Sequence, residues 1–473
     1  MNFMKSARLL LFSLTLIASA GSATAMTHEY VVSFDGDMRR MQVMASFGEP
    51  VDNIAARSRE AGDYLDNVRD CTTANSDRIR IRNRRMLLPK NGIDCLSYSV
   101  DLRRAARNER RNASLAKSNF IVSPADWLWR PTISDDDDII VRFELPDNVD
   151  VSVPWIAVAG EMNTFRVVDS PETSTAFAAF GQFQYREIDI SGASLRVTIM
   201  QAKEKFRFDP LFEWVHDTAV AVNLVYGRFP NPNTSVLVLP MGARWSSDDA
   251  VTFGRVVRDG GETVELFVNP KRPIDEFYDS WTATHEFSHL MLPYVKEEHR
   301  WISEGFASYY QNVLMARDGR YTEERAWLKL SQGFERGRQS RPEMSLNEAA
   351  SEGWRGATMK IYWSGAAIAL MADTELRQRS NGDESLDSVL ERLQACCLPS
   401  DHSWSGTEFF TKLDTLVEEP VFMPLYRRYA NTTGFPDVQP LLDDLGVDFV
   451  GNQVQLRKTA ELADVRIAIM QTP

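Results

Sequence analysis

The chain has 473 residues, more than one hydrophobic core normally serves, so we expect two or three domains. With 53 basic and 66 acidic side chains the formal net charge is −13, a balance that argues against a nucleic-acid-binding protein. Hydrophobic residues make up 44% of the sequence and charged residues 25%, as in ordinary globular proteins, so composition alone points to no special class.

The first 25 residues have the pattern of an export signal. Lys5 and Arg8 form a basic start, an apolar run follows over residues 9–17, and small residues at 23–25 resemble a cleavage site. The apolar run is far shorter than the roughly 20 residues that a membrane-spanning helix needs. We therefore expect residues 1–25 to be removed and the mature chain to be exported, to a bacterial periplasm or to the medium, without a transmembrane segment.

Residues 26–205 have the pattern of a β-rich domain. Short runs that are rich in β-branched residues, such as 139–145 and 194–200, lie between turn signals. Short strands separated in this way are typical of an antiparallel β-sandwich. We expect a sandwich-like N-terminal domain over this range.

The four cysteines fit an oxidising compartment and allow three pairings. Cys71 and Cys95 flank a strand–turn–strand pattern, so their union is the expected one. Cys396 and Cys397 would then be a neighbouring pair or two thiols with other partners. The paired spacings that a zinc knuckle requires are absent.

From residue 206 onward the pattern becomes mainly helical. Residues 209–226 predict a helix, and residues 236–239 predict a strand. The pair Gly260 and Gly261 then precedes a second strand pattern, in which Glu262 is the first residue. The plain interpretation of the two glycines is a hairpin turn.

A helix pattern without internal glycine or proline covers residues 275–292 and contains the motif His-Glu-Phe-Ser-His at 285–289. Residues i and i+4 of a helix lie on one face, so His285 and His289 can both bring a ring nitrogen to one metal ion, about 2.0–2.1 Å away. Glu286 lies roughly 100° around the helix. There it can accept a proton from water without being a ligand. This spacing predicts a zinc-hydrolase site.

A catalytic zinc ion usually has three protein ligands. Glu304 is the expected third ligand, because the apolar residues around it have helical spacing and a second helix that crosses the first would deliver its carboxylate. The alternative continuation His-x-x-Gly-x-x-His fails, since Leu292 and Val295 stand where Gly and His are required. His299 is the other candidate. We expect one Zn²⁺ per chain.

The motif at 285–289, followed by Trp-Ile-Ser-Glu-Gly-Phe-Ala at 301–307, resembles the gluzincin clan of zinc metallopeptidases, whose members use a His, His, Glu site. The run Tyr-Trp-Ser-Gly-Ala-Ala-Ile-Ala-Leu at 362–370, with further matches to residue 389, is similar to the glycyl aminopeptidase family. The resemblance extends over roughly residues 206–395.

This resemblance implies an α+β multidomain fold. A β-sandwich-like domain over 26–205 would precede a thermolysin-like, mainly helical catalytic domain over 206–395, and a helical C-terminal region would cover 396–473. Many glycyl aminopeptidases continue into a PDZ domain. We expect none here, because only some 25 residues follow the last family match.

The resemblance also implies a peptidase activity with a peptide or protein as the partner, and favours an aminopeptidase. By resemblance Tyr362 donates a hydrogen bond to the oxyanion, with Tyr309 and Tyr310 as the next candidates; the alternative for Tyr362 is a core aromatic residue. Glu262 would hold the amino group of the substrate, against the alternative of a simple hairpin residue.

Three departures from the pattern keep other functions open. Only residues 290–303 separate His289 from Glu304, Ser364 replaces the usual lysine, and neither Gly-Leu-Glu-His nor Gly-Ala-Met-Glu-Asn, which read a substrate amino terminus, appears. A zinc endopeptidase and a catalytically reduced peptide-binding protein of the same fold are therefore the alternatives. The presence of every expected ligand and of the base favours a peptidase.

Overall fold

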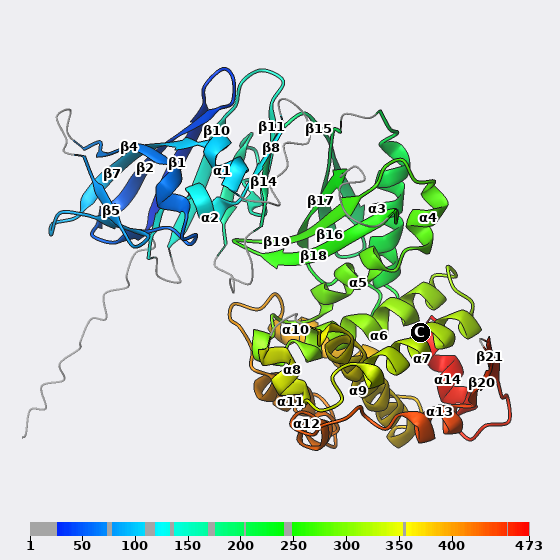
Figure 1. Cartoon of the computed structure of the whole chain (residues 1–473). Coiled ribbons are helices and arrows are strands. Elements are labelled where there is room, and N and C mark those ends of the chain that lie inside the picture. The colour runs from blue at the N-terminus through cyan, green and yellow to red at the C-terminus, as the bar shows by residue number, and fades with distance from the viewer. Residues whose placement is uncertain are drawn as a thin grey trace, which may run out of the picture.

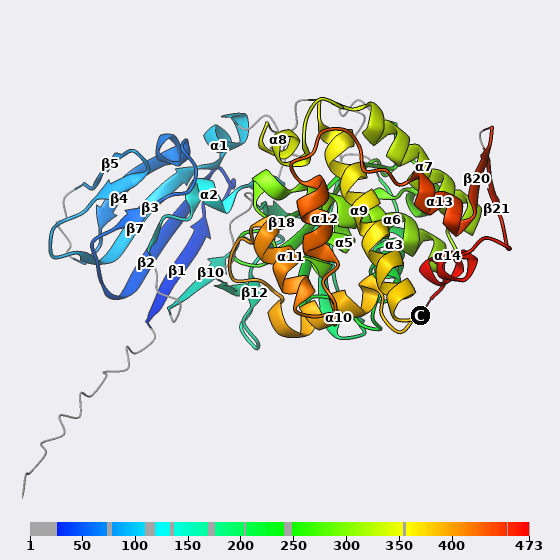
Figure 2. The same ribbon diagram turned by 90° about the horizontal axis from the view of Figure 1, so that it is seen from below.

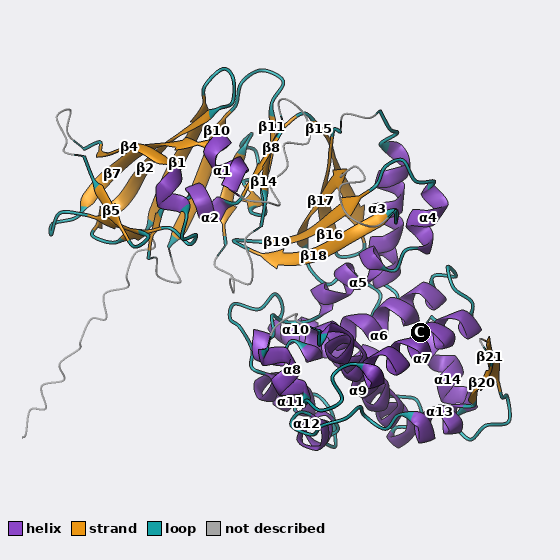
Figure 3. Cartoon of the chain, in the orientation of Figure 1, coloured by secondary structure: helices purple, strands orange, loops and turns teal. Residues whose placement is uncertain are grey.

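A computed structural model describes residues 26–72, 78–108, 119–132, 137–168, 176–202, 205–240, 248–352, 356–451 and 453–472. Its arrangement has three parts in chain order: a β-rich N-terminal part, a second sheet, and a helical part (Figures 1 and 3). The predicted export signal at residues 1–25 lies outside the described residues. Within the described part of the chain, no helix combines the length and the apolar character needed to cross a membrane.

Within the described residues, the N-terminal part contains three sheets. The largest has the order β12-β13-β10-β1-β2-β7-β4, in which β1 and β10 are parallel and the other described pairs are antiparallel. Its strands are β1 (Thr27–Phe34), β2 (Arg40–Val51), β4 (Leu65–Asp70), β7 (Ile93–Asp101), β10 (Asp138–Glu144), β12 (Ile156–Ala157) and β13 (Thr164–Val167). One smaller sheet has the order β5 (Arg80–Arg82), β6 (Arg85–Leu87), β3 (Ile54–Ala55) and β9 (Arg130–Pro131). The other has the order β11 (Asp150–Ser152), β14 (Ala178–Gly181) and β8 (Phe120–Val122).

Alternation along the strands builds the core of this part. In β2 every second residue from Met41 to Phe47 is buried while its neighbours are exposed, as expected when one face of a sheet meets the core. The short helices described in this part are the 3-10 helix η1 (Ala61–Tyr64), α1 (Leu102–Asn108) and α2 (Pro124–Trp127). Cys71 and Cys95 form the expected disulfide, next to the paired ends of β4 and β7.

The second sheet has the order β15-β16-β17-β19-β18. Its strands are β15 (Phe183–Ile190), β16 (Ala193–Met200), β17 (Asn233–Pro240), β18 (Val251–Arg258) and β19 (Glu262–Val268), with α3 (Asp209–Val222) between β16 and β17. The domain boundary expected at residue 205 therefore differs from the sheet boundary, which lies near 182, because β16 pairs in parallel with β17. The alternating pattern of a strand such as β16 does not tell with which other strand it will pair.

The remaining chain is mainly helical. It contains α4 (Ile274–Asp279), α5 (Thr282–Ser288), η2 (His289–Met291), η3 (Glu297–His299), α6 (Trp301–Arg317), α7 (Glu323–Gln339), α8 (Leu346–Ser351), α9 (Thr358–Arg379), α10 (Leu386–Cys397), α11 (Gly406–Asp414), α12 (Phe422–Tyr429), α13 (Gln439–Leu445), β20 (Val447–Val450), β21 (Gln453–Leu456) and α14 (Ala463–Met470). Figure 2 shows α11 and α12 beside α9.

The C-terminal region, expected as a helical tail, shares the core of the second sheet and of the preceding helices. A single cluster of buried apolar side chains runs from Leu195 in β16 to Met470 in α14. Phe410 of α11 contacts the ring of Trp301 at the start of α6, with ring centroids 5.9 Å apart. The hairpin β20–β21 adds strands that the helical pattern did not predict.

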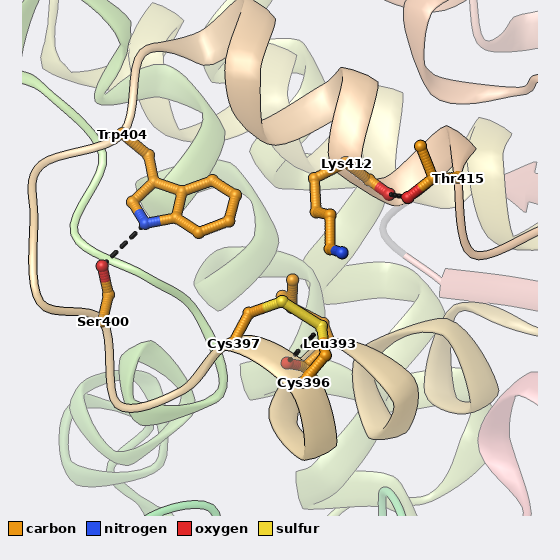
Figure 4. The surroundings of a disulfide bond; sticks show 7 residues. All are labelled: Leu393, Cys396, Cys397, Ser400, Trp404, Lys412 and Thr415. Carbon is orange, nitrogen blue, oxygen red and sulfur yellow. Dashed lines mark hydrogen bonds between the residues drawn. A yellow bond between two sulfur atoms is a disulfide. The ribbon is translucent and has the colours of Figure 1, made fainter. Parts of the chain in front are cut away.

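Cys396 and Cys397 form a disulfide at the C-terminal end of α10 (Figure 4). The loop that follows reaches Trp404, whose indole Nε1 donates to Ser400 Oγ at 2.7 Å. The backbone of Trp404 pairs with residues 294–296, since its N–H donates to Tyr294 O at 2.8 Å and its carbonyl accepts from Lys296 N at 2.9 Å. The loop therefore supports the segment between η2 and η3.

Candidate active site

The helix predicted over 275–292 is divided in two. The helix α4 ends at Asp279, and Ser280 has an extended backbone with φ −76° and ψ 128°. The second piece, α5, lies beneath β18 and packs against both β18 and α6 (Figure 1). His289 follows α5 but keeps a helical backbone, with φ −61° and ψ −24°, so His285 and His289 still share one face.

The structure brings the three predicted metal ligands together. One ligand atom from each of His285, His289 and Glu304 lies within 4.8 Å of the others. Glu304 Oε2 is 3.3 Å from His285 Nε2 and 3.5 Å from His289 Nε2. Ligand atoms about 2.0–2.1 Å from a tetrahedral ion lie about 3.3–3.4 Å apart. The donor set and its spacing therefore fit Zn²⁺.

The charges of the site favour a cation. Burial opposes ionisation of Glu304, but the imidazoles of His289 and His285 hold the pKa of its carboxyl well below the usual value. Burial also disfavours a charge on His285, yet Glu304 and Glu286 raise the pKa of that imidazole. Both pKa shifts mean that the carboxylates of the site attract positive charge. A metal ion can supply that charge in place of protons.

Gln311 is a site residue that the sequence analysis did not name. Its Oε1 lies 2.8 Å from Nδ1 of His285, which leaves Nε2 of that ring facing Glu304. A partner on the far nitrogen fixes the orientation and tautomer of a metal-binding histidine. Gln311 lies seven residues after Glu304 on α6, two turns along one face, and this spacing was a signal that could have identified it.

Glu286 lies at the junction of two pockets. A pocket of about 550 Å³ lies toward α4 and α7, and one of about 430 Å³ lies toward η3 and the start of α6. Glu286, Tyr362 and residues Phe253 and Gly254 of β18 line both. A Cβ atom on Gly254 would lie 2.5 Å from Cγ of Glu286, so glycine is required for this close approach.

Tyr362 of α9 faces the same site. Its ring is stacked on that of His285, with centroids 5.5 Å apart and an interplanar angle of 7°. Burial and the neighbouring carboxylates of Glu304 and Glu286 raise the pKa of Tyr362 well above its ordinary value, and its hydroxyl is hydrogen-bonded to Glu304. The hydroxyl therefore stays protonated and able to donate.

Glu262 does not line either pocket, and its carboxylate is hydrogen-bonded within the protein. It is buried, its Oε1 accepts from Arg258 Nε at 2.7 Å, and its Oε2 accepts from the side-chain amide of Asn231. Arg258 in turn donates to Leu292 O at 3.1 Å, so its guanidinium satisfies a carbonyl just beyond the helix that carries His285. This placement does not favour the predicted contact between Glu262 and a substrate amino group.

The other candidates from the sequence lie elsewhere. His299 packs against Tyr426, with ring centroids 6.2 Å apart, and is not part of the ligand group. Tyr309 donates to Asp373 at 2.6 Å, and Tyr310 donates to Asp387 at 2.8 Å, both in a buried network. Tyr362 is therefore the one of the three tyrosines that lines the pockets.

Two glycines allow the helices that carry Glu304 and Tyr362 to cross closely. A Cβ atom on Gly305 would lie 2.3 Å from backbone atoms of Gly365, and one on Gly365 would lie 2.0 Å from Trp301 O. No real Cβ contact is that short, so any side chain at either position must separate α6 from α9. The two functional side chains are next to these crossing points.

We expect Gly305→Ala to destabilise the protein and to reduce its activity per folded molecule. Overpacking typically costs about 1–3 kcal/mol, while the better helix propensity of alanine returns about 1 kcal/mol. Thermal unfolding monitored beside zinc content measures both effects. Gly36→Ala is the control, because a Cβ atom there meets no atom within 4 Å; equal behaviour of the two variants would contradict the close-crossing argument.

Comparison with known proteins agrees with this geometry. Residues 291–368 match the family model of M61 glycyl aminopeptidase, a segment that contains Glu304 and Tyr362 and begins after the histidine motif. The chain is similar to the glycyl aminopeptidases. A comparison with curated protein sequences gives no match.

Several solved structures share the fold. An aminopeptidase N family protein from Idiomarina loihiensis has a TM-score of 0.60 at 13% identity, over 92% of this chain and 78% of the other. The M1 zinc metallopeptidase of Deinococcus radiodurans has a TM-score of 0.51 at 12% identity, over 87% and 94%. Yeast LTA4 hydrolase has a TM-score of 0.55 at 12% identity, over 89% and 70%. The family match therefore indicates a likeness to glycyl aminopeptidases over residues 291–368, and the solved structures indicate a shared fold.

Proposed function

We propose that the protein is an exported zinc-dependent peptidase, in which His285, His289 and Glu304 hold one Zn²⁺ per chain. The observation that carries this proposal is the grouping of these three donors, which line the two pockets that Glu286 and Tyr362 share. Export rests on the signal pattern of residues 1–25. The completeness of the set disfavours a catalytically reduced binding protein.

Zinc, when bound, lowers the pKa of water toward neutrality and polarises the carbonyl group of the scissile bond. Residues of the chain then accept and donate the protons of the reaction. Glu286 accepts a proton from the attacking water and returns it to the leaving amine. Burial raises the pKa of Glu286, which brings it closer to the range in which a carboxylate works as a base at neutral pH.

The chain also contributes to binding and to charge stabilisation. The Tyr362 hydroxyl is a protonated donor that can meet the developing oxyanion. The strand β18 is the edge of its sheet, and its residues line both pockets. An extended peptide can add to such an edge through main-chain hydrogen bonds. This would hold the scissile carbonyl beside Glu286.

The family likeness favours an aminopeptidase, whereas the two pockets favour an endopeptidase. Pockets on both sides of Glu286 leave room for substrate residues before and after the cleaved bond. The carboxylate of Glu262, predicted to hold a substrate amino group, is occupied by Arg258 and Asn231. Both modes use the same chemistry at Glu286.

Hydrolysis of paired peptides with free and acetylated amino termini tests the proposal and separates the two modes. We expect hydrolysis of both members, because the carboxylate of Glu262 is already engaged by Arg258 and Asn231 and does not select an ammonium group. A strong preference for the free amino terminus that Glu262→Ala removes would instead establish the aminopeptidase role of Glu262. No hydrolysis of any peptide by the zinc-loaded protein would contradict the proposed function itself.

A further inference from the structure

The hairpin of β5 and β6 concentrates positive charge at one end of the molecule. Residues 78–90 contain five arginines and one lysine and no aspartate or glutamate, whereas the whole chain has a net charge of −13. Figures 1 and 2 show β5 at the end of the N-terminal part that lies away from the helical part. Charge segregated in this way creates a local positive potential on an otherwise acidic protein.

The pairing of the two strands places this charge on one face of the hairpin. Arg80 of β5 lies opposite Leu87 of β6. Arg82 lies opposite Arg85. These four residues are exposed, whereas Met86, between the two outward residues of β6, is buried. Because alternate residues of a strand point to the same side, the four side chains share the solvent face of the hairpin, which we call the arginine face.

Two local features of the arginine face oppose folding. Arg82 and Arg85 are like charges directly opposite each other, an arrangement that destabilises a pair of strands. The turn between them has Asn83 at φ 49° and Arg84 at φ 63°, in the left-handed region where glycine is favoured. Arginine at the second turn position adds charge where glycine would fold more easily. Folding of the hairpin alone therefore does not account for these arginines.

The described part of the chain supplies no counter-charge to the arginine face. Arg40 of the same N-terminal part lies 2.9 Å from Asp66. By contrast, no ion pair among the described residues includes Arg80, Arg82 or Arg85. A planar guanidinium suits the two-point binding of a phosphate group. The arginine face can therefore bind an external anion without breaking an ion pair of the described structure.

Leu87 indicates which kind of anionic partner fits the face. Its side chain is 54% exposed although it lies among the arginines. At a lipid bilayer, an apolar side chain gains by entering the boundary of the acyl chains while neighbouring arginines bind the phosphates of the headgroups. A nucleic acid offers phosphates but no such apolar layer, and residues 78–90 contain no aromatic side chain on which its bases could stack.

We propose that the arginine face binds the surface of a membrane that contains anionic lipids. The attachment is peripheral and is made by the side chains of one hairpin. The hairpin lines neither pocket of the candidate active site, so the bound protein can still admit a substrate. This inference goes beyond the proposed peptidase function and does not depend on it.

Sedimentation with lipid vesicles tests the proposal. The probes are vesicles of phosphatidylcholine alone and vesicles of phosphatidylcholine mixed with phosphatidylglycerol, which is anionic. We expect the full chain to bind the anionic vesicles in about 0.1 M salt and to be released as the salt concentration approaches about 0.5 M, because salt screens the attraction between exposed charges.

Variants assign the binding to the hairpin. Arg82→Gln/Arg85→Gln should weaken binding to anionic vesicles by roughly 30-fold, at about 5-fold for each arginine. Its melting temperature should not fall, because the double change also removes the repulsion between the two side chains, so weaker binding cannot be attributed to unfolding. Arg427→Gln/Arg428→Gln, at two exposed positions of α12, is the matched control and should bind like the unmodified protein. Residues 1–25 are identical in every variant, so their own binding to lipid does not affect the comparison.

Leu87→Ser and a DNA duplex distinguish a membrane from a nucleic acid as the partner. Leu87→Ser should weaken vesicle binding by about 5-fold, through the loss of apolar contact, and leave the hydrolysis of a soluble peptide unchanged. The duplex should bind less tightly than the anionic vesicles at the same salt concentration. Equal binding to neutral and anionic vesicles, equal losses in the hairpin variant and its control, or preferential binding of the duplex would overturn the proposal.

Discussion

Replacing Glu286 by glutamine is expected to lower turnover by about 10²–10⁴-fold and to leave zinc content near normal. The amide has the size of the carboxylate, so the close contact with Gly254 can be kept. Its oxygen can still accept the backbone hydrogen bond that Val256 makes with Glu286. What is lost is the ability to accept a proton from water and to return it to the leaving amine.

Peptide hydrolysis and elemental analysis of the same preparation provide the measurement. Glu324→Gln, a change of the same kind at an exposed position of α7, is the control for a general loss of charge. Substantial residual hydrolysis by Glu286→Gln with zinc retained would assign the base to another residue. Loss of zinc together with activity would instead indicate that Glu286 contributes to metal binding.

Removing the hydroxyl of Tyr362 is expected to reduce turnover by about 10²–10³-fold, roughly 2.7–4 kcal/mol, with little change in KM. The phenylalanine ring can keep its stacking on His285. The lost hydrogen bond is one that strengthens in the transition state, when charge develops on the oxyanion. Stability should change little, since the ring and its packing remain and Glu304 keeps its contacts with His285 and His289.

Tyr309→Phe provides a matched comparison on the neighbouring helix α6. The Tyr309 hydroxyl donates to buried Asp373, which would lose that partner. Thermal stability should therefore fall while activity per folded molecule stays near normal. If Tyr362→Phe behaved like Tyr309→Phe, the oxyanion donor would have to be sought elsewhere in the cleft.

The features of the site that were predictable depend on short-range periodicity. The spacing of His285 and His289 survives the end of α5 because His289 keeps a helical backbone. The carboxylate of Glu304 arrives on a second helix, as its apolar neighbours indicated. The position of Tyr362 came from resemblance to a family, since nothing in local spacing relates residue 362 to residue 285.

The features that were missed depend on contacts between distant segments. Glu262 follows a double glycine, but its hydrogen-bond partners Asn231 and Arg258 meet it only in the folded sheet. The glycines themselves pack against Pro154 and Trp155 of the N-terminal part, where a Cβ atom on Gly261 would lie 2.0 Å from Pro154 O. Likewise, the pattern of β16 resembles other strands, and only its pairing with β17 assigns it to the second sheet.

Zinc titration of the metal-free protein tests the central claim most directly. Peptide hydrolysis is measured as zinc is added, and bound metal is determined by elemental analysis. We predict that activity rises to a plateau at one zinc per chain, and that His289→Ala, which removes one of three donors, retains little zinc and little activity. Full hydrolysis by protein without a bound divalent metal, or normal zinc binding by His289→Ala, would contradict the account.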